Sequence, residues 1–125
     1  MKVFLDTHAA IYLWEGRTDR FEDESTRLVR EGTLLLSPFV RLELAFLFEI
    51  GRVTVPPDEI VGGLTGEGAV AVSGDRIDGV VHRAMSLTWT RDVFDRLIVA
   101  TADLHHATLL TRDVRIREHF PSAVW

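Results

Sequence analysis

The amino-acid sequence predicts a three-layer α/β/α fold, in which helices cover both faces of a central parallel sheet of four to five short strands. Short apolar runs alternate along the chain with longer segments whose apolar residues recur at helical spacing. The runs are apolar throughout instead of alternating with polar residues, as in strands buried on both faces. A length of 125 residues, 46% of them hydrophobic, suits a single domain over 1–125 with one core.

The first part of the chain predicts two strands and two helices. Val3–Leu5 is the first strand, and the segment from His8 to Glu15 has the apolar spacing of a helix. Residues 18–31 are rich in charge, which indicates a surface helix that Gly32 ends. The run at 33–36 is the second strand.

The helix after the second strand has a clear start and an unusual composition. Ser37 and Pro38 form an N-cap and first-turn pair that begins a helix well, and we expect this helix to run to about Ile50. It is apolar on nearly every side. Such a helix needs cover all round, from the core or from another subunit.

The rest of the chain continues the alternation. A helix that opens at Pro57 should weaken at Gly62 and Gly63, because glycine disfavours helix interiors. The remaining predicted elements are a strand at 69–72, helices at 75–86 and 92–106, a strand at 107–110, a short helix at 114–119 and an edge strand at 123–125. Strands alternating with helices imply right-handed crossovers and therefore parallel pairing.

The composition excludes several classes of protein. There are no cysteines, so disulfides, Cys-ligated zinc and thiol chemistry are excluded. No apolar stretch approaches the roughly 18 residues of a membrane span, and Asp6 interrupts the apolar start of the chain before it could form a secretory segment. We therefore expect a cytoplasmic protein that does not enter a membrane.

The net charge of −5 at first argues against binding to nucleic acid, which usually leaves a basic footprint. The charge is distributed unevenly, however. Residues 1–75 carry 7 basic and 13 acidic side chains, whereas residues 76–125 carry 7 and 6. Every basic residue except Lys2 is an arginine, and arginine suits bidentate contacts to phosphate.

Four acidic residues fall where a parallel sheet binds ligands, beyond the carboxyl ends of its strands. Asp6 follows the first predicted strand directly, and Asp113 lies just past the fourth. Glu43 is the one acid in the N-terminal half of the apolar helix, and Asp95 lies at the start of the helix before the fourth strand.

Each acid also has an ordinary structural explanation. Asp6, Asp113 and Asp92 stand where a helix N-cap is expected, and capping is the favoured role of Asp92. Glu43 is harder to explain in this way, because a carboxylate on an apolar helix must be paired or coordinated. Asp95, between apolar neighbours, raises the same question more weakly.

Four carboxylates at one edge of a sheet would repel one another strongly. Two like charges about 4 Å apart repel by roughly 4 kcal/mol at an effective dielectric constant near 20. A hard divalent cation relieves this repulsion, and ligation by oxygen alone selects Mg²⁺ or Mn²⁺ over zinc. The acids therefore predict a site for Mg²⁺ or Mn²⁺.

At this point the sequence resembles a known family. The segments VFLDTHAAIYLW, SPFVRLELAFLFEIGRV, RDVFDRLIVATA and ATLLTRD are similar, in order and spacing, to those of the PIN domains of VapC toxins. The resemblance runs from Lys2 to Trp125. It implies a Rossmann-like PIN fold and an Mg²⁺- or Mn²⁺-dependent endoribonuclease that leaves a 3′-hydroxyl and a 5′-phosphate.

The resemblance also assigns roles to residues. The acidic quartet of the family falls on Asp6, Glu43, Asp95 and Asp113, as catalytic and metal-binding residues. Thr7 and Thr111 match small hydroxyl residues that would orient carboxylates or water. Asp92 matches a further acid that is common where the Asp-x-x-Asp-Arg pattern occurs, and it is a candidate for contacting the metal or its waters.

Three arginines, Arg96, Arg112 and Arg115, are candidates for contacting RNA, although each is equally explained as an exposed charge. The partners implied by the resemblance are an RNA substrate, a VapB-type antitoxin and a second copy of the chain. Two copies of the chain would form a homodimer, and the chain with its antitoxin would form a toxin–antitoxin hetero-oligomer.

Two alternative enzyme classes fail on single residues. A receiver domain needs a lysine late in the chain, and the only lysine is Lys2. A haloacid-dehalogenase-like phosphatase needs Asp-x-Asp after its first strand, and here Thr7 and His8 follow Asp6. A non-catalytic PIN-like binding module that acts through contacts with a partner protein remains the open alternative.

Overall fold

The computed structural model describes all residues, 1–125, and its centre is a sheet of five parallel strands in the order β3-β2-β1-β4-β5. The strands are β1 (Lys2–Leu5), β2 (Thr33–Leu36), β3 (Val70–Val72), β4 (Thr108–Leu110) and β5 (Ala123–Val124). Val3, Phe4 and Leu5 are completely buried, as are Leu109 and Leu110 on the neighbouring strand. The fully apolar runs thus mark central strands, as predicted.

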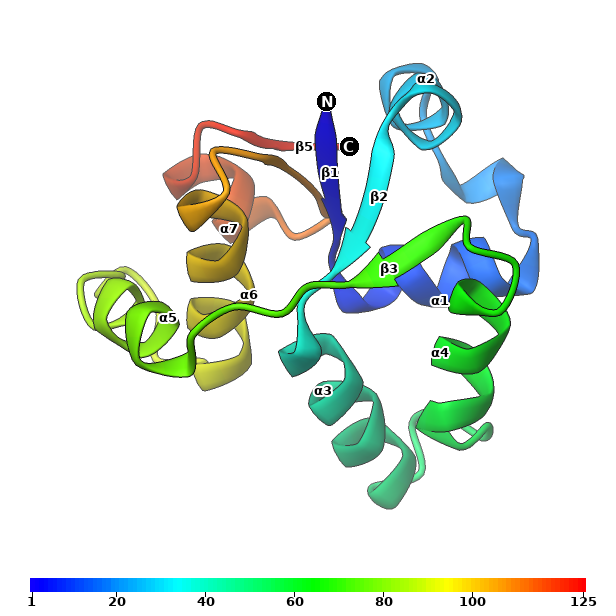
Figure 1. Cartoon of the computed structure of the whole chain (residues 1–125), viewed down its shortest axis with the longest axis horizontal. Helices are drawn as coiled ribbons and strands as arrows, with labels where there is room; N and C mark the ends of the chain where they lie inside the picture. The colour runs from blue at the N-terminus through cyan, green and yellow to red at the C-terminus, as the bar shows by residue number, and fades with distance from the viewer.

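Helices cover both faces of this sheet, so the predicted three-layer α/β/α architecture is confirmed. Figure 1 shows α5, α6 and α7 on one side of the strands and α1, α2 and α4 on the other. The helices are α1 (Thr7–Glu15), α2 (Asp23–Glu31), α3 (Pro38–Glu49), α4 (Pro57–Thr65), α5 (Ile77–Ala84), α6 (Val93–Leu104) and α7 (Val114–His119). No helix combines the length and the apolar character needed to cross a bilayer.

The order of the strands creates one switch point. From β1 the chain moves outward to β2 and β3, then returns to the other side of β1 to form β4 and β5. β1 and β4 are therefore neighbours whose following segments leave toward opposite faces. A crevice opens at the carboxyl ends of such a pair.

The segment at 18–31 is not the single helix that we predicted. A short 3₁₀ helix, η1 (Thr18–Arg20), is separated from α2 by Phe21, whose backbone is extended at φ −93° and ψ 136°. The ring of Phe21 packs 5.0 Å from that of Trp125. This aromatic contact holds Phe21 in place, and helical spacing alone does not reveal it.

Helix α4 continues through Gly62 and Gly63 instead of weakening there. A Cβ atom on Gly63 would lie 2.7 Å from Nε1 of Trp14, so the absence of a side chain lets α1 and α4 approach each other. The glycine serves helix packing, which outweighs its low helix propensity.

Helix α3 is covered on one side only. Val40 and Leu44 are fully buried, whereas Leu42, Phe46, Phe48 and Ile50 are between 40% and 57% exposed. The core thus covers one face of this helix, and within the single chain the predicted cover all round is incomplete.

Candidate active site

Asp6 lies at the switch point, directly after β1. Its backbone N–H donates to the carbonyl of Leu110 at 2.9 Å, which extends the pairing of β1 with β4. Its side chain caps α1: Oδ1 accepts from the N–H of Thr7 at 2.8 Å, and Oδ2 accepts from Oγ1 of Thr111 at 2.5 Å. The carboxylate is 9% exposed, so it is held rigidly at the base of the crevice.

Thr7 and Thr111 connect the carboxylates to one another. Oγ1 of Thr7 donates to Oε1 of Glu43, on a different helix from Asp6. Oγ1 of Thr111 donates to Asp6 and accepts from the N–H of Asp113 at 3.1 Å. The Thr7 hydroxyl thus contacts one acid, and the Thr111 hydroxyl contacts the carboxylate of Asp6 and the backbone of Asp113. Both hydroxyls are placed where they can orient a carboxylate.

Glu43 projects toward Asp6 from α3, about two turns after the helix begins. Ser37 caps this helix, accepting from the N–H of Phe39 at 3.3 Å, and its hydroxyl also lies 3.0 Å from that of Thr101 on α6. This hydrogen bond joins the start of α3, the helix of Glu43, to α6, the helix of Asp95.

Asp92 and Asp95 come from the start of α6. Asp92 is the N-cap, and its Oδ1 accepts from the N–H of Asp95 at 3.0 Å. The loop before it is fixed by Thr90, which accepts from the N–H of Asp92 at 3.1 Å and whose carbonyl accepts from Arg96 at 2.8 Å. Capping, the favoured role of Asp92, is therefore present in the structure.

Asp113 caps α7, the helix that follows β4. Its Oδ1 accepts from the N–H of Ile116 at 2.9 Å. Asp6, Asp92 and Asp113 all cap helices while also facing the crevice. Capping and a place in the site are therefore compatible for the same side chain, because an ionised carboxylate has about four acceptor positions on its two oxygens.

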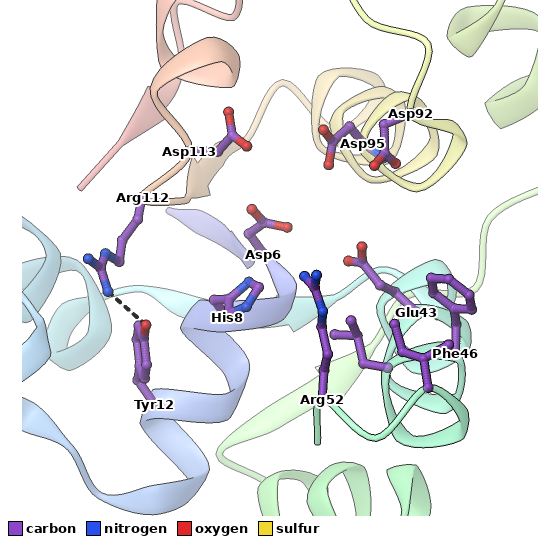
Figure 2. Close-up of a pocket in the computed structure, with 12 residues that line it drawn as sticks. Asp6, His8, Tyr12, Glu43, Phe46, Arg52, Asp92, Asp95, Arg112 and Asp113 are labelled. Carbon is purple, nitrogen blue, oxygen red and sulfur yellow. Dashed lines mark hydrogen bonds between the residues drawn. The ribbon is translucent and has the colours of Figure 1, made fainter. Parts of the chain in front are cut away.

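All five acids line one cleft with a volume of about 670 Å³ (Figure 2). The lining residues are Asp6, His8, Tyr12, Glu43, Phe46, Leu47, Ile50, Arg52, Asp92, Asp95, Arg112 and Asp113. The acids come from four segments that are far apart in the chain: the end of β1, α3, the start of α6 and the segment after β4.

Burial and the charges of neighbouring carboxylates raise the pKa values of three acids, Asp6, Glu43 and Asp95. Burial, and then the nearby charges of Asp6 and Asp92, raise the pKa of Glu43 to about 7, although the hydrogen bond from Thr7 opposes the rise. Burial, followed by the charge of Asp92, raises the pKa of Asp95 to about 8. The surroundings of Glu43 and Asp95 thus favour the protonated form of each carboxyl group over the ionised form.

Burial also raises the pKa of Asp6, against the hydrogen bonds from Thr111 and Thr7. Perturbed carboxylates gathered in one cleft are typical of functional sites. A divalent cation bound among them would offset the repulsion, and the five donors are hard oxygen ligands suited to Mg²⁺ or Mn²⁺. As the side chains stand, no three of them already surround a common point for an ion, so binding would require these side chains to move.

The sequence did not single out the rest of the cleft wall. His8 and Tyr12 follow Asp6 on one face of α1, and their rings lie 6.5 Å apart. Phe46, Leu47 and Ile50 continue the face of Glu43 at intervals of three, four and seven residues. Helical spacing from each predicted acid would have found these residues.

Of the three arginines predicted to contact RNA, one lines the cleft and two do not. Arg112 lines the cleft and its Nη1 donates to the hydroxyl of Tyr12 at 2.7 Å (Figure 2). Arg96 and Arg115 do not line it, and Arg96 donates instead to the carbonyl of Thr90. Arg52, which the sequence did not single out, extends toward the acids in Figure 2.

A comparison with protein families decides where this chain belongs. The family model described as PIN domain matches residues 3–119, a span that includes all five acids of the cleft. The chain belongs to the PIN domain family. This result confirms the resemblance at the level of the family.

The PIN domain is also similar to solved structures. One is VapBC2 from Rickettsia felis bound to a DNA fragment from their promoter, at 17% identity and a TM-score of 0.66, covering 99% of this chain and 96% of the other. A second is VapBC-1 from nontypeable Haemophilus influenzae, at 17% identity and a TM-score of 0.68, covering 100% and 96%.

A third is a toxin–antitoxin complex from Klebsiella pneumoniae, at 16% identity and a TM-score of 0.66, covering 98% and 96%. At such low identity, these three likenesses establish a shared fold. No curated protein sequence gives a significant match to this PIN domain.

Proposed function

We propose that this PIN domain is an Mg²⁺- or Mn²⁺-dependent endoribonuclease that acts in the cytoplasm as the toxin of a VapBC-type pair. One observation carries the proposal: five carboxylates from distant parts of the chain line one cleft at the switch point of the sheet. Burial and mutual repulsion destabilise the ionised forms of these carboxylates, and a bound cation would offset both effects.

Asp6, Glu43, Asp95 and Asp113 would hold the ion, and Asp92 would contact it or its waters. Bound there, the ion would lower the pKa of a water molecule and offset negative charge on the scissile phosphate. The hydroxyls of Thr7 and Thr111 keep Glu43 and Asp6 turned into the cleft. Phe46, Leu47 and Ile50 give the cleft an apolar wall beside Glu43.

The biological pairing is supported by the structural relatives. All three of them are toxin–antitoxin or VapBC assemblies by description, and each aligns with nearly the whole of this chain. We infer that a VapB-type antitoxin binds this chain and that the chain forms a homodimer. The exposed apolar side chains of Leu42, Ile77, Val81 and Met85 support an interface with another protein surface.

The direct test is RNA cleavage by the purified chain with Mn²⁺ or Mg²⁺. Asp6→Asn should lower the rate at least a hundredfold and weaken Mn²⁺ binding measured by calorimetry, and excess EDTA should stop cleavage by the wild type. Glu67→Gln, which removes an exposed acid far along the chain from the four segments of the site, is the matched control and should cleave normally.

Full activity of Asp6→Asn, or activity in excess EDTA, would refute a metal-dependent site. Turnover also separates this proposal from the non-catalytic binding module. A folded wild-type chain that binds Mn²⁺ and a partner protein but cuts no RNA would favour the module.

A further inference from the structure

A groove lined by three arginines adjoins the acidic cleft. It has a volume of about 520 Å³, and Arg112 lines both the groove and the cleft, so the two lie on either side of this residue. The residues of the groove are Asp19, Arg20, Phe21, Glu22, Arg112, Val114, Arg117 and Trp125. They come from η1 and the segment after it, from the segment between β4 and α7, from α7 itself and from the C-terminal residue.

The three arginines of this groove form no ion pair with a carboxylate. The arginines in ion pairs are Arg17, Arg27, Arg41 and Arg83. Arg112 donates to the hydroxyl of Tyr12, and Arg117 donates to the carbonyl of Arg112 at 3.2 Å. A guanidinium has five N–H donors, so one neutral acceptor leaves the charge and most donors free for a phosphate.

Tyr12 holds two of these guanidinium groups in place. Cζ of Arg112 lies 5.6 Å from the centre of the Tyr12 ring, and Cζ of Arg20 lies 5.7 Å from it. The ring itself packs 6.2 Å from that of Trp125, which is almost fully buried. Cation–π attraction to a packed ring positions both charges before any ligand arrives.

The two acids of the groove do not cancel these charges. Asp19 is paired with Arg17, at 3.2 Å from Nε, and that pair is neutral. Glu22 is then the one unpaired acid against Arg20, Arg112 and Arg117. Positive charge thus lies directly beside a cleft whose wall carries five carboxylates.

We propose that Arg20, Arg112 and Arg117 bind phosphates of the RNA strand that flank the scissile bond, with the strand running from the acidic cleft into this groove. The inference rests on the proposed function for the nature of the substrate. A strand cut over the carboxylates must bring neighbouring phosphates to the rim of the cleft. On the side of the groove, the arginines at this rim are Arg20, Arg112 and Arg117, whereas Arg52 lies on the wall of the cleft itself.

The test is the binding of a fluorescent single-stranded RNA to the full chain in EDTA, measured by anisotropy over a range of salt concentrations. Arg20→Gln combined with Arg117→Gln removes two arginines of the groove that do not line the acidic cleft. Arg30→Gln combined with Arg76→Gln is the matched control, because both residues are exposed, have no side-chain partner and change the net charge equally. Thermal melting checks that all variants are folded.

We expect the groove variant to bind RNA roughly tenfold more weakly, with a salt dependence smaller by about 1.4, at roughly 0.7 per lost phosphate contact. The control variant should keep both the affinity and the salt dependence. Equal losses in the two variants would show an effect of net charge alone and would overturn the groove, as would unchanged binding in both.

Cleavage assays in Mn²⁺ separate this inference from the proposed function. If the groove variant binds and cuts RNA like the wild type, the groove is wrong and the nuclease stands. If the wild type neither binds nor cuts RNA, both are wrong. Binding that depends on the groove, without any cleavage, would support the groove and oppose the nuclease.

Discussion

Single side chains in this PIN domain serve the fold and the site at once. Asp6 caps α1 with one oxygen and accepts from Thr111 with the other, while it also lines the cleft. The sequence offered capping and a site as competing explanations for Asp6, Asp92 and Asp113. The structure combines them, because a helix that starts at the carboxyl end of a strand places its cap at the ligand-binding edge.

Asp95→Asn should make the metal-free protein more stable at high pH. The pKa of Asp95 is raised to about 8, so the folded chain holds this proton more tightly than the unfolded chain. Its contribution to the free energy of unfolding therefore falls as the pH rises from about 4 toward 8. The variant lacks this penalty, and its melting temperature in EDTA at pH 8.5 should exceed that of the wild type by about 2–4 °C.

At pH 5.5 the carboxyl of Asp95 is protonated in the folded protein, so most of this gain should be absent. Glu67→Gln, at an exposed loop position, should change neither melting temperature. An equal gain for Asp95→Asn at both pH values would point to packing instead of charge.

Thr111→Val should loosen the site without changing its shape. The hydroxyl of Thr111 donates to Asp6 and accepts from the N–H of Asp113, and valine offers neither contact. Leaving the buried carboxylate with one donor fewer should cost about 1–3 kcal/mol of unfolding free energy. Calorimetry should also show weaker Mn²⁺ binding.

Thr111→Ser keeps the hydroxyl and separates the two effects. It should lose some stability with the missing methyl group but retain Mn²⁺ affinity within about twofold. If serine and valine weakened Mn²⁺ binding equally, the hydroxyl of Thr111 would have no orienting role.

At the scale of elements, the sequence predicted all five strands and all seven helices, because each carries its own local signal. Apolar runs marked the strands, and Ser37 with Pro38 marked the start of α3. The errors arose where tertiary contacts override local preference. Phe21 interrupts a helical segment to pack on Trp125, and Gly63 is tolerated within α4 because it meets Trp14.

The two adjacent glycines of α4 should respond in opposite directions to alanine. Nothing lies within 4 Å of a Cβ built on Gly62, so Gly62→Ala should stabilise the protein by about 1 kcal/mol through helix propensity. A Cβ on Gly63 would lie 2.7 Å from the indole of Trp14, so Gly63→Ala should cost about 1–3 kcal/mol as Trp14 is displaced. Urea unfolding of the two variants measures both effects, and each variant is the control for the other. Stabilisation by both would mean that the indole moves aside without loss of packing.

At the scale of the whole molecule, acidic and basic side chains gather in two adjacent places, and the net charge does not reveal this. The net charge of −5 argued against an RNA partner, yet five acids lie in one cleft beside a groove with three free arginines. Strand ends and helix starts made Asp6, Asp92, Asp95 and Asp113 predictable, because each stands next to an element boundary. Glu43 was predictable for another reason, as the one acid in the N-terminal half of an apolar helix. The groove was not predictable, since Arg20 and Arg112 meet only through the ring of Tyr12.

The outer face of α5, with Leu42 of α3, should form the homodimer interface. Ile77, Val81 and Met85 recur every fourth residue and are 66%, 44% and 68% exposed, and Leu42 is 57% exposed. A continuous apolar stripe of this kind loses contact with water when a second copy covers it, at roughly 25 cal/mol per Å² of apolar area. Sedimentation should therefore show a dimer for the wild type and a monomer for Ile77→Asp combined with Val81→Asp.

Val93→Asp removes an equally exposed apolar side chain at the start of α6 and should remain dimeric. A wild type that sediments as a monomer at high concentration would contradict the dimer. A dimer that survives the double substitution but dissociates with Val93→Asp would move the interface to the mouth of the acidic cleft, where dimerisation and RNA binding would compete.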